Sequence, residues 1–306
     1  MRESEKMHKQ LEAYMKEHGS DNMSEKQMNN LLEGFVKQYN SMLPQSVTPS
    51  NAETSDDYLE LAENARSEKE ALQYAQKALE LEPDNLDAER IVATAGVKDP
   101  LTVLDNLYRA VIHGTEIMKS EGFMTKEYIG DFWGVVETRP YMRLRHEFVE
   151  TLIEAGMFRK AAAECEDMIR LCENDNLGVR YILMHLYAYL EDERAALRLY
   201  KKYDGHEETQ MLLPLSILYF KLYELDKAKD YLVRLSKTNK DTKKFFRAVR
   251  QDKIDEYADE MQPFGYRPFT IEELIMEVTE NEFLFSAVPG YFWWADKQLV
   301  VKRKNS

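Results

Sequence analysis

The sequence of 306 residues is poor in the residues that interrupt helices or form disulfides, with 12 Gly, 9 Pro and 2 Cys. Cys165 and Cys172 are seven places apart on one expected helix. This spacing separates them by about 10.5 Å along the helix axis, which is too far for a disulfide. We therefore predict two reduced thiols in the core of an all-α fold.

Long apolar segments are also missing. The longest apolar run, residues 212–220, contains Ser216 and is far shorter than the roughly 18 residues needed to cross a membrane. The first six residues carry no apolar stretch of the signal-peptide kind. We predict a cytoplasmic protein with no membrane segment.

The motifs of common catalytic sites are absent. The sequence has no glycine-rich phosphate loop, no Gly-x-Ser-x-Gly elbow and no histidine pair with an intervening Glu. Lys and Arg total 41 against 55 Asp and Glu, a net charge of −14, which disfavours nucleic acid as a partner. We predict no catalytic residue, no metal site and no cofactor, and a protein that is not an enzyme.

What the sequence does contain is a helical repeat. Residues 70–85 resemble the second helix of a tetratricopeptide unit. Ala71, Ala75 and Ala78 would let a neighbouring helix approach closely, and Pro83 would end the helix.

The same frame recurs downstream. Gly156 would form the turn inside the next unit, and Ala161, Ala195 and Ala228 would fill equivalent packing positions. Their spacings of 34 and 33 residues match the roughly 34-residue period of this repeat. We predict an α-solenoid of tetratricopeptide-type helical hairpins.

Four segments follow from this pattern. We predict an N-terminal helical arm over residues 1–43, a linker over 44–56, the repeat array over 57–240 and a non-repeat C-terminal capping region over 241–306.

Three helix starts are predicted from local signals. Ser24 with Gln27 resembles a capping box, and Asp99 with Pro100 would begin a long helix that ends near Lys119. A further helix is expected to begin at Ile271.

Two segments, Asp131–Arg143 and Asn174–Tyr181, resemble the tetratricopeptide proteins related to the suppressor of tumorigenicity 7 family, which occur in bacteria as well as eukaryotes. The resemblance extends from about Asp57 to Ala287–Gly290. It implies the repeat architecture and does not imply a particular activity.

A carboxylate clamp for chaperone tails is one known use of such repeats, and it needs Lys and Asn on the first helices. Here the equivalent positions are His146 and Glu150 in one unit and Arg180 and Met184 in the next. The departure disfavours a chaperone-tail receptor.

Guanidinium groups on the inner wall could hold a carboxylate or phosphate by paired hydrogen bonds. The leading hypothesis is a non-enzymatic scaffold that binds a peptide or helix of another protein in its concave groove. The predicted partner-binding residues are Arg139, Tyr141, Arg143, His146, Glu150, Arg180, Met184 and Tyr187.

Three alternatives remain open. Arg139 and Arg180 could instead join Glu137, Asp175 and Asn176 in a buried structural network. The groove could bind a small molecule or an anion, as a sensor or an enzyme, through Arg139, Arg143, Arg180 and Tyr187. The chain could also form a homo-oligomer through its N-terminal arm or its C-terminal aromatics, although these aromatics could equally cap the array; they are Phe283, Phe285, Tyr291, Phe292, Trp293 and Trp294.

Overall fold

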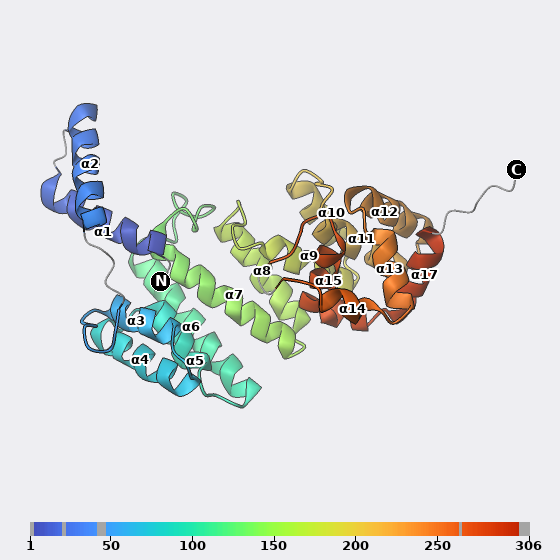
Figure 1. Ribbon diagram of the computed structural model, residues 1–306, viewed down its shortest axis with the longest axis horizontal. Coiled ribbons are helices and arrows are strands. Elements are labelled where there is room, and N and C mark those ends of the chain that lie inside the picture. The colour runs from blue at the N-terminus through green and yellow to red at the C-terminus, as the bar shows by residue number, and fades with distance from the viewer. Residues whose placement is uncertain (1–2, 20–22, 42–46, 263–264, 300–306) are drawn as a thin grey trace, which may run out of the picture. The chain divides into compact units, whose positions relative to one another are not determined.

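The computed structural model describes residues 3–19, 23–41, 47–262 and 265–299, and over these residues it is all-helical (Figure 1). The described residues contain no strand, only isolated bridges from Gly130 and Asp131 to Cys172. The predicted fold class is confirmed at this level. None of the described helices has the length and apolar character required to cross a membrane.

The chain divides into two compact units, Met1–Thr151 with Leu171–Glu173, and Leu152–Arg170 with Asn174–Ser306. The four segments drawn from the sequence stay predictions. The helices in chain order are α1 (Glu3–His18), α2 (Glu25–Ser41), α3 (Ser55–Glu63), α4 (Glu68–Leu81), α5 (Leu86–Thr94), α6 (Pro100–Ser120), the 3₁₀ turn η1 (Val136–Thr138), α7 (Arg139–Glu154), α8 (Phe158–Leu171), α9 (Val179–Leu190), α10 (Glu193–Lys202), α11 (Thr209–Lys221), α12 (Leu225–Thr238), α13 (Thr242–Arg250), α14 (Ile254–Ala258), α15 (Ile271–Glu280), α16 (Glu282–Ser286) and α17 (Pro289–Leu299).

The local signals place the helix starts correctly. The backbone N–H of Ser24 donates to the Gln27 side chain at 2.9 Å just before α2. The Asp99 carboxylate accepts from the backbone N–H of Thr102 at 3.0 Å, and α6 begins at Pro100. Gln27 satisfies the N–H of Ser24, the residue just before α2, and Asp99 satisfies an N–H in the first turn of α6, so both boundaries are fixed by a few neighbouring residues.

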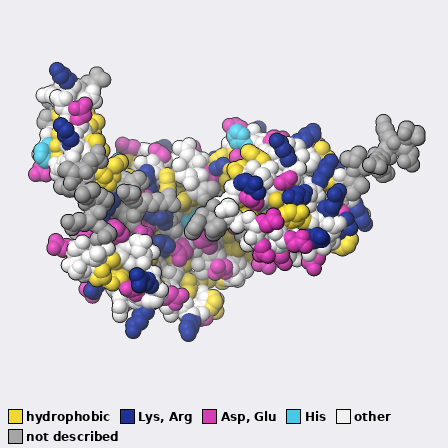
Figure 2. Space-filling model, viewed as in Figure 1, with side chains coloured by type: hydrophobic (Ala, Val, Ile, Leu, Met, Phe, Trp, Pro, Cys, Tyr) yellow, Lys and Arg dark blue, Asp and Glu magenta, His cyan; other side chains and the backbone are white. Residues whose placement is uncertain are grey.

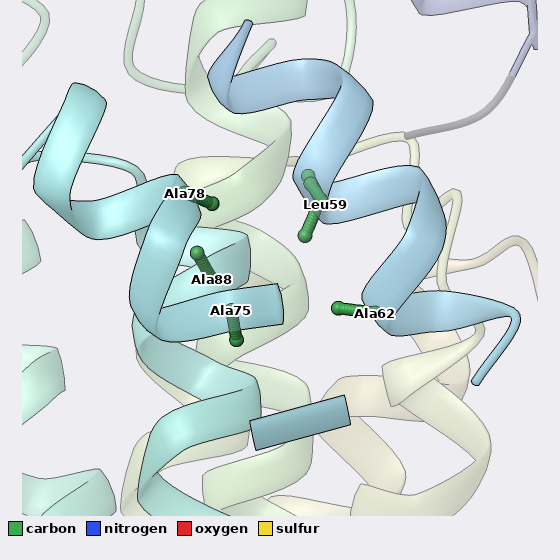
Figure 3. Packing of buried hydrophobic residues seen from close by; sticks show 5 residues of the cluster. All are labelled: Leu59, Ala62, Ala75, Ala78 and Ala88. Atoms are coloured by element: carbon green, nitrogen blue, oxygen red, sulfur yellow. The ribbon is translucent and has the colours of Figure 1, made fainter. Parts of the chain in front are cut away.

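Small side chains let the first helices of unit 1 pack closely. Figure 3 shows Leu59 and Ala62 of α3 pointing toward Ala75 and Ala78 of α4 and Ala88 of α5. All five are buried, and α4 ends at Leu81, as expected from the alanine spacing and the downstream proline. This packing fixes α5, which carries one half of the site described below.

In unit 2 the apolar run of residues 212–220 forms most of α11 and is largely buried. The hydroxyl of Ser216 donates to the carbonyl of Ala228 on α12 at 2.8 Å, so the polar residue in that run is satisfied. The hydroxyl of Tyr291 on α17 in turn donates to Ser216 at 2.8 Å. Cys165 and Cys172 are buried and are not joined in a disulfide, as predicted.

The C-terminal aromatics pack mainly inside unit 2. Tyr291 is fully buried with its ring edge against Phe246, at 5.8 Å between centroids, and Phe285 is also buried. Trp293 is the one member of the predicted aromatic set that is exposed. The contacts observed are those of the capping alternative.

Candidate functional site

Arg143 of α7 is bound on three of its nitrogens in unit 1. Its Nε and Nη2 donate to the two carboxylate oxygens of Asp87 on α5, at 2.9 and 2.6 Å. Its Nη1 donates to Glu5 of α1 at 2.8 Å. This guanidinium therefore joins three helices that are far apart in the sequence.

The electrostatics of this cluster stabilise the charged forms. Burial of Asp87 disfavours ionisation, but the hydrogen bonds and charge of Arg143 outweigh it and lower the pKa of Asp87 below its usual value. The pKa of Arg143 is correspondingly raised, because its hydrogen bonds and charge interactions with Asp87 and Glu5 outweigh the opposing effect of burial. Buried ion pairs persist only when hydrogen bonds replace the lost water, and the bidentate geometry meets that condition.

Glu5 brings α1 onto the rest of unit 1. Its side chain is only 2% exposed, and its Oε1 lies 3.6 Å from Nη1 of Arg139 as well as accepting from Arg143. The Nε of Arg139 donates to the carbonyl of Trp133 at 2.8 Å, and its guanidinium lies over the Trp133 ring. The two arginines thus form a pocket for one carboxylate, and α1 supplies that carboxylate.

Two lysines of α1, Lys6 directly after Glu5 and Lys9 one turn beyond it, face the acids of α3. Nζ of Lys6 lies 3.2 Å from Glu60 and 3.9 Å from Asp57. Nζ of Lys9 lies 3.6 Å from Asp56. We call the surface that receives α1 the α1-docking site; its residues are Asp56, Asp57, Glu60, Asp87, Arg139 and Arg143.

A cleft of about 250 Å³ lies beside the docked helix and is lined with acids. It is bordered by one lysine, Lys9, and by apolar side chains of α3, α5, α6 and α7. Its negative potential suits a cationic group and disfavours an anion. The carboxylates at its wall are Glu5, Glu82, Asp84, Asp87, Glu121 and Glu137.

Three other predicted site residues lie on α7. Tyr141 is 2% exposed and its hydroxyl is 2.8 Å from that of Thr115, so it belongs to the core and offers no surface to a partner. His146 is half-buried, 3.7 Å from the exposed carboxylate of Glu150. Of these three, only the last two reach the surface.

Arg180, Met184 and Tyr187 belong to unit 2. Arg180 is held by Asp175 at 3.1 Å and stacks on the ring of Tyr181 at 4.2 Å. This is the Arg180–Asp175 part of the structural network that the sequence left open.

The other two predicted residues of unit 2 are core residues. Met184 is fully buried, and Tyr187 is buried with its hydroxyl donating to Glu166 at 2.6 Å. Burial together with that hydrogen bond raises the pKa of Tyr187. We therefore remove Met184 and Tyr187, like Tyr141, from the candidate partner surface.

The sequence did not single out the acids of the α1-docking site. Asp87 follows the Asn85 cap of α5 and has the sequence context of an ordinary first-turn acid. Glu5 lies in a charged, amphipathic segment where solvation is the usual role. The available signal was the alternation of charge in Glu5, Lys6 and Lys9, which on one helix presents an acid and two bases to a partner surface.

Comparison with family models, curated proteins and solved structures finds no match to this chain. The family resemblance drawn from the sequence therefore remains a prediction.

Proposed function

We propose that this chain is a cytoplasmic, non-enzymatic scaffold that binds a helix of a partner protein at the α1-docking site. The partner helix would carry a Glu that enters the pocket of Arg139 and Arg143, followed by basic residues that meet the acids of α3. In this proposal α1 is a built-in ligand that a partner helix must displace.

The observation that carries the proposal is the way α1 is held. Its contacts are ionic: one buried carboxylate against two guanidiniums, and two half-exposed lysines against three acids. Ionic contacts of half-exposed side chains contribute little stability each, so this part of the contact can open. A helix with the same charge order would find complementary groups already in place.

The alternative of an anion-binding sensor or enzyme has less support. The polar groups of Arg143 are occupied by two carboxylates, and the neighbouring cleft is acidic. An anion would have to displace Glu5 from a pocket that already holds a carboxylate.

The proposal keeps the α-solenoid of tetratricopeptide-type hairpins and the relationship to bacterial proteins of the suppressor of tumorigenicity 7 family as its architectural basis. Successive helices in unit 1 and in unit 2 pack on one another, as such hairpins do. A groove along such an array is a common way to bind a helix.

The test is a binding measurement with α1 supplied as a separate molecule. A full-length arm variant with Glu5→Ala, Lys6→Ala and Lys9→Ala frees the site without shortening the chain. A fluorescent peptide of residues 1–18 should bind this variant at least about tenfold more tightly than the wild type, as measured by anisotropy, because loss of a charge-assisted hydrogen bond costs about 1.5–3 kcal/mol. A peptide with the same three alanines should not bind.

A charge swap gives the specificity control. Asp56→Lys with Glu60→Lys in the arm variant should abolish binding of the native peptide and accept a peptide with Lys6→Glu and Lys9→Glu, because Lys9 faces Asp56 and Lys6 faces Glu60. Glu80→Lys on α4, an exposed acid away from the site, should change nothing. If the native peptide binds the folded arm variant no better than the alanine peptide does, the proposal is wrong.

The biological partner is sought with the same variant. Affinity capture with the arm variant should retain a protein that excess peptide of residues 1–18 releases. A captured protein that remains bound under that competition does not use this site.

A further inference from the structure

An exposed apolar stripe runs along α6 in unit 1. Of the ten large apolar side chains exposed among the described residues, Leu101, Tyr108 and Ile112 lie on this one helix. They are 64%, 53% and 44% exposed, and their spacings of seven and four places put them on one side of the helix. Contiguous apolar surface of this kind marks a contact site in soluble proteins.

Charged residues border the stripe on one flank. Asp105 and Arg109 lie alongside the stripe and form an exposed ion pair at 2.8 Å. Glu116 continues the same flank about two turns beyond Arg109, and Lys98 lies just before the start of the helix; both are exposed. We call these side chains together the α6 face: Lys98, Leu101, Asp105, Tyr108, Arg109, Ile112 and Glu116.

The charges of the α6 face can pair with those of a second, antiparallel α6 face, because acids and bases stand at equal distances on the two sides of one level of the helix. Taking the level of residue 107 as the centre, Asp105 lies two places before it and Arg109 two places after. Lys98 lies nine places before it and Glu116 nine places after. Asp105 is thus matched by Arg109 at the mirrored level of the helix, and Glu116 by Lys98 in the segment that leads into the helix.

We propose that the α6 face binds the same face of a second copy of this chain, with the two α6 helices antiparallel about a two-fold axis at the level of residue 107. Such an axis carries a flank of one helix onto the same flank of the other, so Asp105 meets Arg109 of the second copy and Lys98 meets Glu116. In this arrangement Leu101 of one copy and Ile112 of the other differ by only one residue in their distance from the axis along the helix. The Tyr108 side chains of the two copies lie beside the axis. A two-fold contact of this type uses one patch twice.

The charges select this arrangement over a parallel one. In a parallel two-fold pair the charged flank of one helix would lie on the side away from that of the other, and none of these ion pairs would form. A contact made by one helix face falls at the small end of specific interfaces, so the dimer is expected to be weak and concentration-dependent. This surface is separate from the α1-docking site, and its test does not depend on that proposal.

Sedimentation velocity of the full chain over a wide concentration range tests the contact. The wild type should show a monomer–dimer equilibrium. Ile112→Asp should raise the dissociation constant by at least about tenfold, which corresponds to about 1.4 kcal/mol. Leu81→Asp, at a side chain of α4 with 54% exposure, is the matched control and should leave the equilibrium unchanged.

The charge variants identify the partner as a second copy. Asp105→Arg alone and Arg109→Asp alone should each weaken the dimer, because like charges then face each other. An equimolar mixture of the two variants should associate as a heterodimer, and the double swap in one chain should restore the homodimer. A wild type that stays monomeric, or a dimer unaffected by Ile112→Asp and by both charge reversals, would overturn the proposal.

Discussion

At the scale of single residues, the most demanding feature is a carboxylate held away from water. Asp87 is 1% exposed and depends on the two parallel hydrogen bonds of Arg143. Removing one partner of such a pair leaves the other charge buried and uncompensated, whereas removing both is far less costly.

This asymmetry gives a first prediction. Arg143→Met should lower the free energy of unfolding by about 3–5 kcal/mol, because Asp87 loses its main partner. The double variant with Asp87→Leu should recover part of that loss, because Glu5 still lacks its hydrogen bond from Arg143. Urea unfolding followed by circular dichroism measures both, and equal destabilisation in the single and double variants would contradict the argument.

His113 on α6 provides a prediction about pH. Its Nδ1 lies 2.8 Å from Glu89, and this hydrogen bond, opposed by partial burial, raises the pKa of His113 above its usual value near 6.5. A raised pKa in the folded state adds stability that is complete below pH 6.5 and is lost as the pH rises through the folded-state pKa.

Two measurements check this sign. An NMR titration should find the pKa of His113 above 6.5 in the wild type and closer to 6.5 in Glu89→Gln. The stability difference between these two proteins should shrink as the pH rises above the wild-type value. A difference that grows with pH would mean that the ring is not held as a cation.

At the scale of helices, the contacts between neighbouring helices depend on capping side chains and on a glycine that lets two helices approach closely. Asn85 caps α5 by accepting from the N–H of Ala88 at 3.0 Å, and its amide donates to Ser55 of α3 at 2.9 Å. One side chain therefore satisfies a helix end and fixes its neighbour.

Asn85→Ala should destabilise unit 1 by about 1–2 kcal/mol, the upper part of the usual range for a lost cap. Asn85→Ser keeps a capping acceptor without adding charge and loses the amide that donates to Ser55, so its effect should be smaller. Thermal unfolding of the two variants separates the cap from the helix–helix bond, and an alanine variant as stable as the wild type would show that neither matters.

Gly114 marks the closest approach within unit 1. A Cβ at this position would lie 2.9 Å from the ring of Tyr141 and 3.1 Å from Leu86. Gly114→Ala should therefore destabilise by about 1–3 kcal/mol through overpacking, although alanine is normally the better helix former. A more stable variant would mean that the two neighbours can move aside without cost.

The helix boundaries that could be predicted are those whose signals are local. Asp99, Pro100 and Gly156 act through bonds or φ values within a few residues, and the structure has each where the pattern put it. Arg143 shows the limit of this approach. Its partners lie 56 and 138 positions away, and no local spacing in the sequence identifies them.

At the scale of the whole molecule, the sequence correctly excluded a strand-rich fold but could not separate accessible residues from buried ones on the inner helices. Tyr141, Met184 and Tyr187 fit the repeat template as wall residues, yet all three are buried. Burial of a given turn depends on which neighbouring helix covers it, and only tertiary packing determines that.

Figure 2 shows Lys and Arg interspersed with Asp and Glu on the visible face of unit 2, so this face has no uniform positive charge of the kind that attracts nucleic acid.

The C-terminal helices give a prediction at this scale. A chain ending after residue 262 would lack Tyr291 and leave Phe246 and Ser216 uncovered. We expect it to bind a hydrophobic dye and to aggregate, as measured by fluorescence and light scattering. Trp293→Ser, which alters only an exposed ring, should behave like the wild type. A soluble truncated chain that binds no dye would show that the cover is dispensable.

The covalent connection between α1 and its docking site sets a threshold for any competitor. Since Glu5 and Arg143 belong to one chain, α1 is present at its site at an effective concentration on the order of millimolar, whatever the protein concentration in the cell. A partner at micromolar concentration must then bind about a thousandfold more tightly than α1 to occupy half of the sites. Under the proposed function, the arm thereby acts as a filter on affinity, admitting tight partners and rejecting weakly complementary helices that share its charge order.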